Sequence, residues 1–478
     1  MSEQPDLDDE TPVDPVSSYR LFKLGCAAVL AGSALAWWRS SAEDPLQLYI
    51  GLAILILGCL PGLQWARHGR PWFPCFEISM LTCVVFYAVP LLTQSDGIKN
   101  YSNSVTETSG LMVITYLASA VLAFNAVRTP RTAPYWASTK LLPDEIGRFL
   151  PAGLFINTTY ILLNRFTDLI PYNFLGTLRA ICFGLGIITA FIMAREWGRD
   201  RLTQNQKTLF VSCLLVQVLV LFSHLYLING MSLLILAGIG YTTSRRRLPW
   251  LTIVICLPVI AILHNGKSKM REIYWGETAT VKLPSASGLP AFFTQWIEFG
   301  LQKNEEGEST NLAGKLAERA SLFQMICMSV DQVPSLRPHL LGESYVDIPA
   351  QVIPRFLWPD KPSSLLSNVR LAIYFNLVDP DNPMTTSIAF GIISESYVNL
   401  GFWGVIAIGS LTGFGFKHIV LRSVGTPLFS TLGIFMILLT AWSFQAEQVA
   451  ATWLASLFQA SVISIGVPLA WKKFFGDI

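Results

Sequence analysis

The sequence predicts an all-α polytopic membrane protein with about twelve transmembrane helices, and two observations carry that prediction. Of the 478 residues, 52% are hydrophobic and only 14% are charged, whereas a soluble chain carries about 25% charged residues. The apolar residues also gather in runs, and a helix needs about 20 of them to cross a bilayer. Disordered, collagen-like and disulfide-scaffold classes are excluded by the same composition. The net charge of +2 gives no reason to expect a nucleic-acid partner.

The chain begins with a polar segment, residues 1–20, which we expect to be a disordered cytoplasmic tail. Its charged residues are mostly acidic, whereas a secretory signal begins with a basic leader. Twelve apolar runs follow. They cover 21–38, 46–63, 74–93, 109–127, 146–163, 173–194, 208–223, 226–242, 249–264, 400–417, 427–446 and 449–470.

Basic residues fix the expected orientation, because they favour the cytoplasmic side of a membrane. The stretch 208–242 is almost unbroken and fits one span or two. A single span would place the arginine triplet 245–247 outside, so we expect two spans with a turn near 224–230. Both termini are then cytoplasmic, and the short external loops hold few cations. These are Arg39, Lys99 and Arg165.

This topology divides the chain into the tail at 1–20, spans one to nine at 21–264, a large external or periplasmic loop at 265–399, and spans ten to twelve at 400–478. The loop is rich in proline, which interrupts regular structure. Apolar residues recur at helical spacing between Asn311 and Val330, so we expect amphipathic helices within it. The eight cysteines lie mostly in apolar runs and form no CxxC pair, so we expect apolar filling rather than a metal site or disulfides.

Three clusters of charged and polar residues are candidates for a functional site, and the first of them follows span nine. Lys267, Lys269 and Arg271 stand at the outer end of that span, where cations are disfavoured. One interpretation is a tolerated exception, because long loops translocate regardless of charge. The other is that these cations bind an anion at the outer membrane face.

The second cluster comprises Glu343, within the sequence GESY, and the proline-stiffened segment IPRFLWPDKP at 353–362. Arg355 can grip a phosphate through two hydrogen bonds, and Lys361 adds a point charge. Trp358 offers a flat face for a sugar ring, or an anchor at the membrane interface.

The third cluster is SESYVNLG at 394–401, at the outer end of span ten. An ionisable residue beside a membrane span is a functional candidate. Glu395 therefore has two readings, a cap at a helix N-terminus or a general base and ligand for substrate hydroxyls. Tyr397 and Asn399 are its polar neighbours. Further along, the spacing of Gly409 and Gly413 is typical of helix packing.

The segments IPRFLWPDKP (353–362) and ESYVNLGFWG (395–404), with one large loop late among many spans, resemble Wzy-type polymerases of bacterial O-antigen and exopolysaccharide repeat units. The resemblance implies a GT-C-type glycosyltransferase of the bacterial inner membrane, independent of metal and of any cofactor. Such an enzyme transfers a glycan from undecaprenyl pyrophosphate to the non-reducing end of the next lipid-linked repeat unit. Its expected partners are that lipid-linked oligosaccharide, membrane lipid, a chain-length regulator and a repeat-unit flippase.

Carried over by matching position, the resemblance gives Glu395 and Arg355 as catalytic residues, with Glu395 binding or deprotonating the acceptor. The residues expected to bind pyrophosphate are Arg271, Arg355, Lys361, Lys269 and Arg319. The residues expected to bind glycan are Trp358, Tyr397, Asn399 and Glu343. Two alternatives remain, a ligase that transfers finished glycan and a twelve-span transporter or flippase. A two-halved carrier keeps its long loop at the centre, whereas here the central loop at 195–207 is short.

Overall fold

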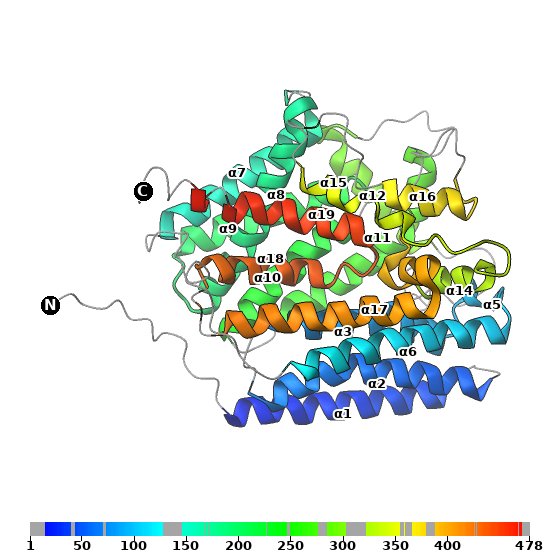
Figure 1. Ribbon diagram of the computed structural model, residues 1–478. Helices are drawn as coiled ribbons and strands as arrows, with labels where there is room; N and C mark the ends of the chain where they lie inside the picture. Colours follow the sequence, from blue (N-terminus) through cyan, green and yellow to red (C-terminus); the bar gives the residue numbers. More distant parts are fainter. Residues whose placement is uncertain are drawn as a thin grey trace. The chain divides into compact units, whose positions relative to one another are not determined.

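The structure is a computed structural model of the whole chain. It describes residues 15–39, 44–69, 73–127, 146–167, 169–170, 172–225, 227–245, 249–275, 284–302, 322–353, 358, 366–378, 388–424, 426, 428–466 and 468–470. Within these ranges the chain is 83% helical and contains no strand. The all-α class predicted from the sequence is therefore confirmed (Figure 1).

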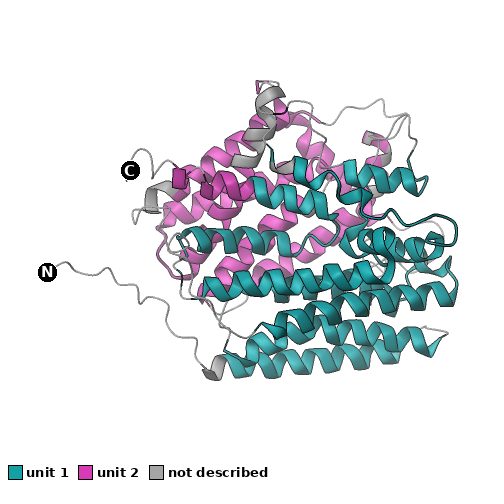
Figure 2. Ribbon diagram, in the orientation of Figure 1, with its two compact units in different colours: residues 1–140, 317–459 teal, residues 141–316, 460–478 magenta. Residues whose placement is uncertain are grey.

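The chain forms two compact units, each assembled from two separate stretches (Figure 2). Unit 1 comprises residues 1–140 and 317–459, and unit 2 comprises residues 141–316 and 460–478. The divisions predicted from the sequence describe membrane topology and not compact units, so they stay predictions. They are 1–20, 21–264, 265–399 and 400–478.

Unit 1 contains helices from two stretches that are far apart in the sequence. Its first stretch holds α1 (Pro15–Arg39), α2 (Pro45–Arg67), α3 (Cys75–Cys83), the π-helical turn η1 (Val84–Ala88), α4 (Val89–Leu92), α5 (Asp96–Lys99) and α6 (Asn103–Ala126). Its second stretch holds α14 (Phe323–Gln332), η4 (Glu343–Tyr345), α15 (Ile348–Val352), α16 (Leu366–Tyr374), α17 (Gly391–Ser423), α18 (Thr431–Ser443) and most of α19 (Ala450–Ser461). Figure 1 shows α1, α2, α6 and α17 running side by side.

The glycine spacing in α17 explains the close packing of α17 on α6. A Cβ atom at Gly409 would meet the carbonyl oxygen of Tyr116, and one at Gly413 would strike that of Ala120. Small residues let two helix backbones approach, which is how helices associate in a lipid environment. The predicted packing role of these two glycines is confirmed.

Unit 2 holds the helices from the middle of the chain. They are α7 (Ile146–Phe166), α8 (Tyr172–Gly198), α9 (Gln204–Phe222), α10 (Leu227–Arg245), α11 (Trp250–Trp275), η3 (Ala286–Gly288), α12 (Leu289–Leu301) and η5 (Val462–Gly466). On α12, Phe292 and Trp296 are buried against Leu263 and Met270 of α11, while Ile297 is exposed. An amphipathic helix thus lies within the predicted loop 265–399, although the stretch 303–321 is outside the described residues.

Eight helical segments among the described residues are long and apolar enough to cross a membrane. They are Ser18–Trp38, Pro45–Arg67, Cys75–Leu92, Asn103–Ala126, Gln204–Phe222, Trp250–Lys267, Gly391–Ser423 and Ala450–Ala470. The protein is therefore membrane-embedded and all-α, whereas twelve spans, cytoplasmic termini and an external loop stay predictions. The expected burial of cysteines holds for five of the eight. These are Cys75, Cys83, Cys182, Cys213 and Cys327.

Several predicted boundaries differ from the helix ends. Residues 15–20, expected to end a disordered tail, are the first residues of α1. The stretch 208–242 belongs to two helices, α9 and α10, as expected, with the break after Phe222. Span ten is predicted to begin at 400, and α17 begins nine residues earlier, at Gly391, with a break in its backbone at Leu400 and Gly401. The position at which the chain enters the membrane stays a prediction.

Candidate functional site

The site is organised by a break in α17. Leu400 and Gly401 have non-helical backbone angles, and Gly401 has φ +60° and ψ −147°, a conformation that favours glycine. The helix therefore consists of a first half, Gly391–Asn399, and a second half, Phe402–Ser423. A break of this kind leaves carbonyl groups without their helical partners.

A short segment before η4 satisfies two of these carbonyls. The N–H of Leu340 donates to the carbonyl of Val398 at 3.1 Å, and the N–H of Leu341 donates to that of Asn399 at 3.0 Å. Buried backbone groups need such partners. The segment around residue 340 is thus fixed against the end of the first half of α17.

Glu395 lies inside this first half and is completely buried. Its Oε1 accepts a hydrogen bond from the hydroxyl of Ser344 at 2.8 Å. Its Oε2 accepts one from the N–H of Ala450 at 2.7 Å. Ala450 is the first residue of α19, so a negative charge on Glu395 is favoured by that helix dipole. The sequence left two interpretations of Glu395, a helix cap and a general base. In the structure Glu395 caps the N-terminus of α19, although it lies on α17.

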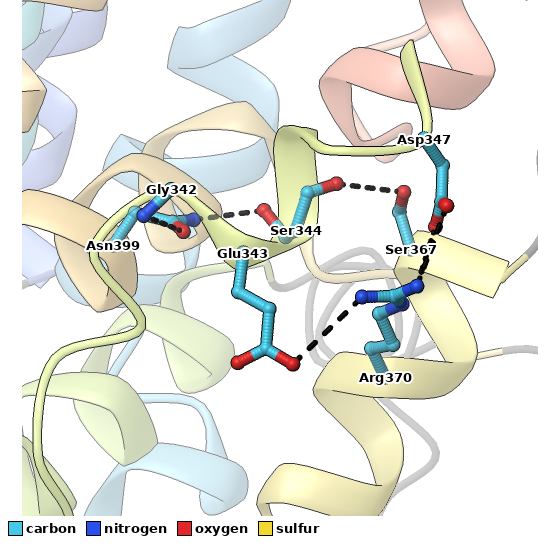
Figure 3. A network of polar contacts seen from close by, with 7 residues as sticks. All are labelled: Gly342, Glu343, Ser344, Asp347, Ser367, Arg370 and Asn399. Atoms are coloured by element: carbon cyan, nitrogen blue, oxygen red, sulfur yellow. Dashed lines mark hydrogen bonds and ion pairs between the residues drawn. The ribbon is translucent and has the colours of Figure 1, made fainter. Parts of the chain in front are cut away.

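Asn399 joins the same cluster from the end of the first half (Figure 3). Its amide nitrogen donates to Ser344 Oγ at 2.8 Å and to the carbonyl of Glu395 at 2.7 Å. Its Oδ1 accepts the N–H of Gly342 at 3.0 Å. Ser344, Glu395 and Asn399 are each fully buried, and their contacts join α17 to the GESY segment and, through Ala450, to α19. These three side chains form the buried cluster of the site.

An ion-pair group borders the buried cluster (Figure 3). The hydroxyl of Ser367 donates to the carbonyl of Ser344 at 2.8 Å and ties α16 to the cluster. Arg370, one turn further along α16, lies 3.2 Å from Asp347 Oδ2 and 3.8 Å from Glu343 Oε1. The Asp347 side chain is 6% exposed and that of Glu343 is 61% exposed. The Glu343 carboxylate is therefore open to solvent, while the buried carboxylate of Asp347 holds Arg370.

The pKa of Tyr345 is shifted by its position beside the buried cluster. Burial, and secondly the charge of Glu395, raise the pKa of the Tyr345 phenol above its ordinary value. Tyr345 is therefore a neutral phenol at physiological pH. It can donate a hydrogen bond but cannot act as a base there.

The structure brings three predicted site residues together, Glu395, Asn399 and Glu343. Tyr397 lies on the same half of α17, but its hydroxyl donates to the carbonyl of Val333 at 3.1 Å, so its contact is with the end of α14. Trp358 is described and is 40% exposed. The predicted residues Arg355, Lys361 and Arg319 lie outside the described residues.

The remaining predicted cations belong to unit 2. Arg271 donates to the carbonyl of Leu225 at 2.9 Å, and Lys269 donates to Gln302 Oε1 at 3.1 Å. Arg165, at the end of α7, donates to Ser223 Oγ at 3.2 Å. Arg165 and Arg271 thus reach the same turn between α9 and α10 from two different helices. Sequence reasoning placed Arg165 outside as a cation but did not connect it with Arg271.

Sequence reasoning included Ser344 in the GESY cluster without giving it a role, and it missed Ser367 and Arg370. A serine gives no signal of its own in a sequence. Arg370 could have been noticed as a cation in the predicted external loop, but its acidic partners lie 23 and 27 positions earlier. Among the described residues, no group of three or more His, Cys, Asp or Glu side chains could hold a metal ion.

Comparison with known proteins gives one match. The model of a family described as "Domain of unknown function (DUF8712)" matches residues 144–445, which is more than half of the chain. No curated protein and no solved structure matches the chain.

Proposed function

Since the chain belongs to the DUF8712 family, whose description gives no activity, we propose its function from its own residues. We propose a metal-independent glycosyltransferase of the bacterial inner membrane. It transfers a glycan from undecaprenyl pyrophosphate to the non-reducing end of the next lipid-linked repeat unit, at the outer face of the membrane.

One observation carries this proposal. The segments GESY and ESYVN, read separately from the sequence as polar clusters, are joined by the hydrogen bonds of Ser344 to Glu395 and of Asn399 to Ser344. A carboxylate held among polar groups beside a membrane span is expensive and therefore a functional candidate. The exposed carboxylate of Glu343 and the half-exposed guanidinium of Arg370 lie at its border, where glycan hydroxyls could bind.

The remaining roles follow the chemistry of the side chains. Arg355 and Arg271 bind the pyrophosphate of the donor, because a guanidinium forms two parallel hydrogen bonds to phosphate oxygens. Lys269, Lys361 and Arg319 add positive charge. Trp358 stacks on a sugar ring, and its exposed face suits that role.

Reconstituted protein tests the proposal. The full chain in liposomes is given purified undecaprenyl-pyrophosphate-linked repeat units, and products are separated on a gel. We expect a ladder of polymer that persists in EDTA. Glu395→Gln and Arg271→Ala should each lower the rate about 10²–10³-fold, as removing a preorganised electrostatic contact typically does.

Glu298→Gln is the matched control, because Glu298 is an exposed carboxylate on α12 to which the proposal gives no role. It should leave the ladder unchanged. Wild-type protein that moves repeat units across the bilayer without joining them would favour the flippase alternative. Transfer of finished glycan to a lipid A core, without a ladder, would favour the ligase.

A further inference from the structure

The loop between α18 and α19 holds a second carboxyl group beside the site, Glu447. Its Oε2 is buried and accepts no hydrogen bond from the described part of the chain, and the same holds for Oε1 of Gln448. Both atoms are acceptors. A buried acceptor without a donor destabilises the fold, so a hydroxyl or N–H group that donated a hydrogen bond to these atoms would bind favourably here.

Glu395 differs from Glu447 in this respect. Both carboxylate oxygens of Glu395 already accept hydrogen bonds, from Ser344 and from Ala450. A substrate hydroxyl that gave its proton to Glu395 would have to share an oxygen that already accepts a hydrogen bond, whereas Oε2 of Glu447 accepts none from the described residues. Glu395 is also fully buried, whereas Gln445, Glu447 and Gln448 are partly exposed.

The backbone places the two carboxyl groups near the same junction. The N–H of Gly391 donates to the carbonyl of Glu447 at 3.1 Å, and Gly391 lies one helical turn before Glu395. Gly391 has φ +75°, and a Cβ atom there would lie 2.9 Å from the carbonyl oxygen of Ala446 and 3.2 Å from the hydroxyl of Tyr87. The first turn of α17, the 444–449 loop and Tyr87 of η1 are therefore in close contact, with no room for a side chain between them.

We propose that Glu447 is the general base of the transfer and that Glu395 is a positioning residue, which holds α17, the GESY segment and α19 together. This inference rests on the proposed function. The acceptor hydroxyl oxygen forms a bond to the anomeric carbon of the donor, and its proton passes to Glu447 Oε2. The bond from that carbon to the pyrophosphate breaks, and undecaprenyl pyrophosphate leaves with the electron pair.

The protonation of Glu447 suits this role. Burial raises the pKa of Glu447 to about 6, so the group is ionised at neutral pH and remains basic enough to accept a proton. Among the described residues, Tyr87 of η1 interacts electrostatically with Glu447, and Glu395 of α17 bonds to Ala450, the residue that follows the loop. Gln445 and Gln448, in the loop itself, carry no charge.

The test compares pH profiles of kcat/KM for the full chain in liposomes, with a lipid-linked repeat unit as donor and acceptor. Wild-type activity should fall below about pH 6. Glu447→Gln should lower kcat about 10²–10⁴-fold, the range for general acid–base catalysis, and abolish the fall below pH 6. Glu395→Gln should lower the activity but keep that fall.

A third variant guards against misfolding. Glu447→Asp keeps a carboxyl group one methylene shorter, so it should fold, lose part of kcat and keep a fall in acid. Asp331→Asn, at an exposed carboxylate of α14, should match wild type.

An active Glu447→Gln enzyme with an unchanged pH profile would overturn this inference alone. A fall in acid that Glu395→Gln abolishes would make Glu395 the base. An inactive wild type would overturn the proposed function as well.

Discussion

The two halves of α17 lie on one helix but are stabilised in different ways. The first half, Gly391–Asn399, buries Ser394, Glu395 and Asn399, whose side chains bond to serines 51–65 positions away in the sequence. The second half, Phe402–Ser423, packs its glycines against the backbone of α6. The break at 400–401 separates a polar half from an apolar one.

Because the two halves are stabilised differently, we expect substitutions in them to have different effects. Close packing of small residues is what associates helices in lipid, so substitutions in the second half should act on folding. Buried polar groups must keep their partners, so substitutions in the first half should act on the geometry of the site. We make four predictions, from the largest effect to the smallest. The first two test this division, and the last two test carboxyl groups beside the first half.

The largest effect is expected at Gly413. Gly413→Leu should prevent correct folding, because a side chain there would strike the carbonyl of Ala120 on α6, and a backbone group cannot move aside as a side chain can. Gly415→Leu is the control, since a Cβ atom at Gly415 meets no atom within 4 Å. Size-exclusion chromatography in detergent measures the folded fraction. Equal yields of both variants would show that this packing is dispensable.

The next effect is expected at Asn399. Asn399→Leu keeps the size of the side chain but removes three hydrogen bonds. Each buried partner left without a bond costs about 1–3 kcal/mol, so thermal unfolding should shift clearly and the transfer rate should fall. Ser410→Ala, in the second half, should change stability by less than about 0.5 kcal/mol. A melting curve for Asn399→Leu that overlays wild type would contradict a positioning role for the buried cluster.

Sequence reasoning identified the second half of α17 more completely than the first. Helical periodicity and the spacing of Gly409 and Gly413 are local signals, and both the helix and its packing role were predicted. Glu395 and Asn399 were recognised because polar residues beside an apolar run stand out.

Their partners could not be predicted, for a physical reason. Ser344 and Ala450 have no chemical property that marks them in a sequence, and they reach Glu395 only through the tertiary fold. Glu447 was also missed, because a single acidic residue between two spans is typical of an ordinary short loop. The helix that carries span ten also begins before the apolar run that was recognised, at Gly391, since polar residues that are buried look like loop residues in a hydropathy pattern.

The third prediction concerns the dependence of stability on the carboxyl group of Glu447, in the loop that contacts the first turn of α17. The pKa of Glu447 is about 6 in the folded protein, above the ordinary 4.5, so the folded state binds more protons between these values. Stability should therefore be greatest below pH 4.5, fall as the pH rises to about 6, and then level off. The contribution is at most about 2 kcal/mol, because one pKa unit corresponds to about 1.4 kcal/mol.

Melting temperatures between pH 4 and 7 measure this contribution. Glu447→Gln cannot titrate at this position, so the difference between wild type and variant should follow the curve just described. Gln448→Ala, beside it, should keep the wild-type dependence on pH. A difference that rises with pH would mean that the Glu447 carboxylate has a partner in the folded state.

The smallest effect on stability is expected at Glu343, and it separates binding from structure at the edge of the site. The Glu343 side chain is 61% exposed and lies 3.8 Å from Arg370, and exposed ion pairs contribute about 0–1 kcal/mol. Asp347, which is 6% exposed and lies 3.2 Å from the same guanidinium, still holds Arg370 in place after Glu343→Gln. The melting temperature of Glu343→Gln should therefore be nearly unchanged, while Asp347→Asn should destabilise the protein because it removes the buried ion-pair partner of Arg370.

If Glu343 binds acceptor hydroxyls, Glu343→Gln should raise KM for the lipid-linked acceptor without a matching loss of kcat. An unchanged KM would show that Glu343 does not bind the acceptor glycan. A large loss of stability would show that the exposed carboxylate of Glu343 stabilises the fold.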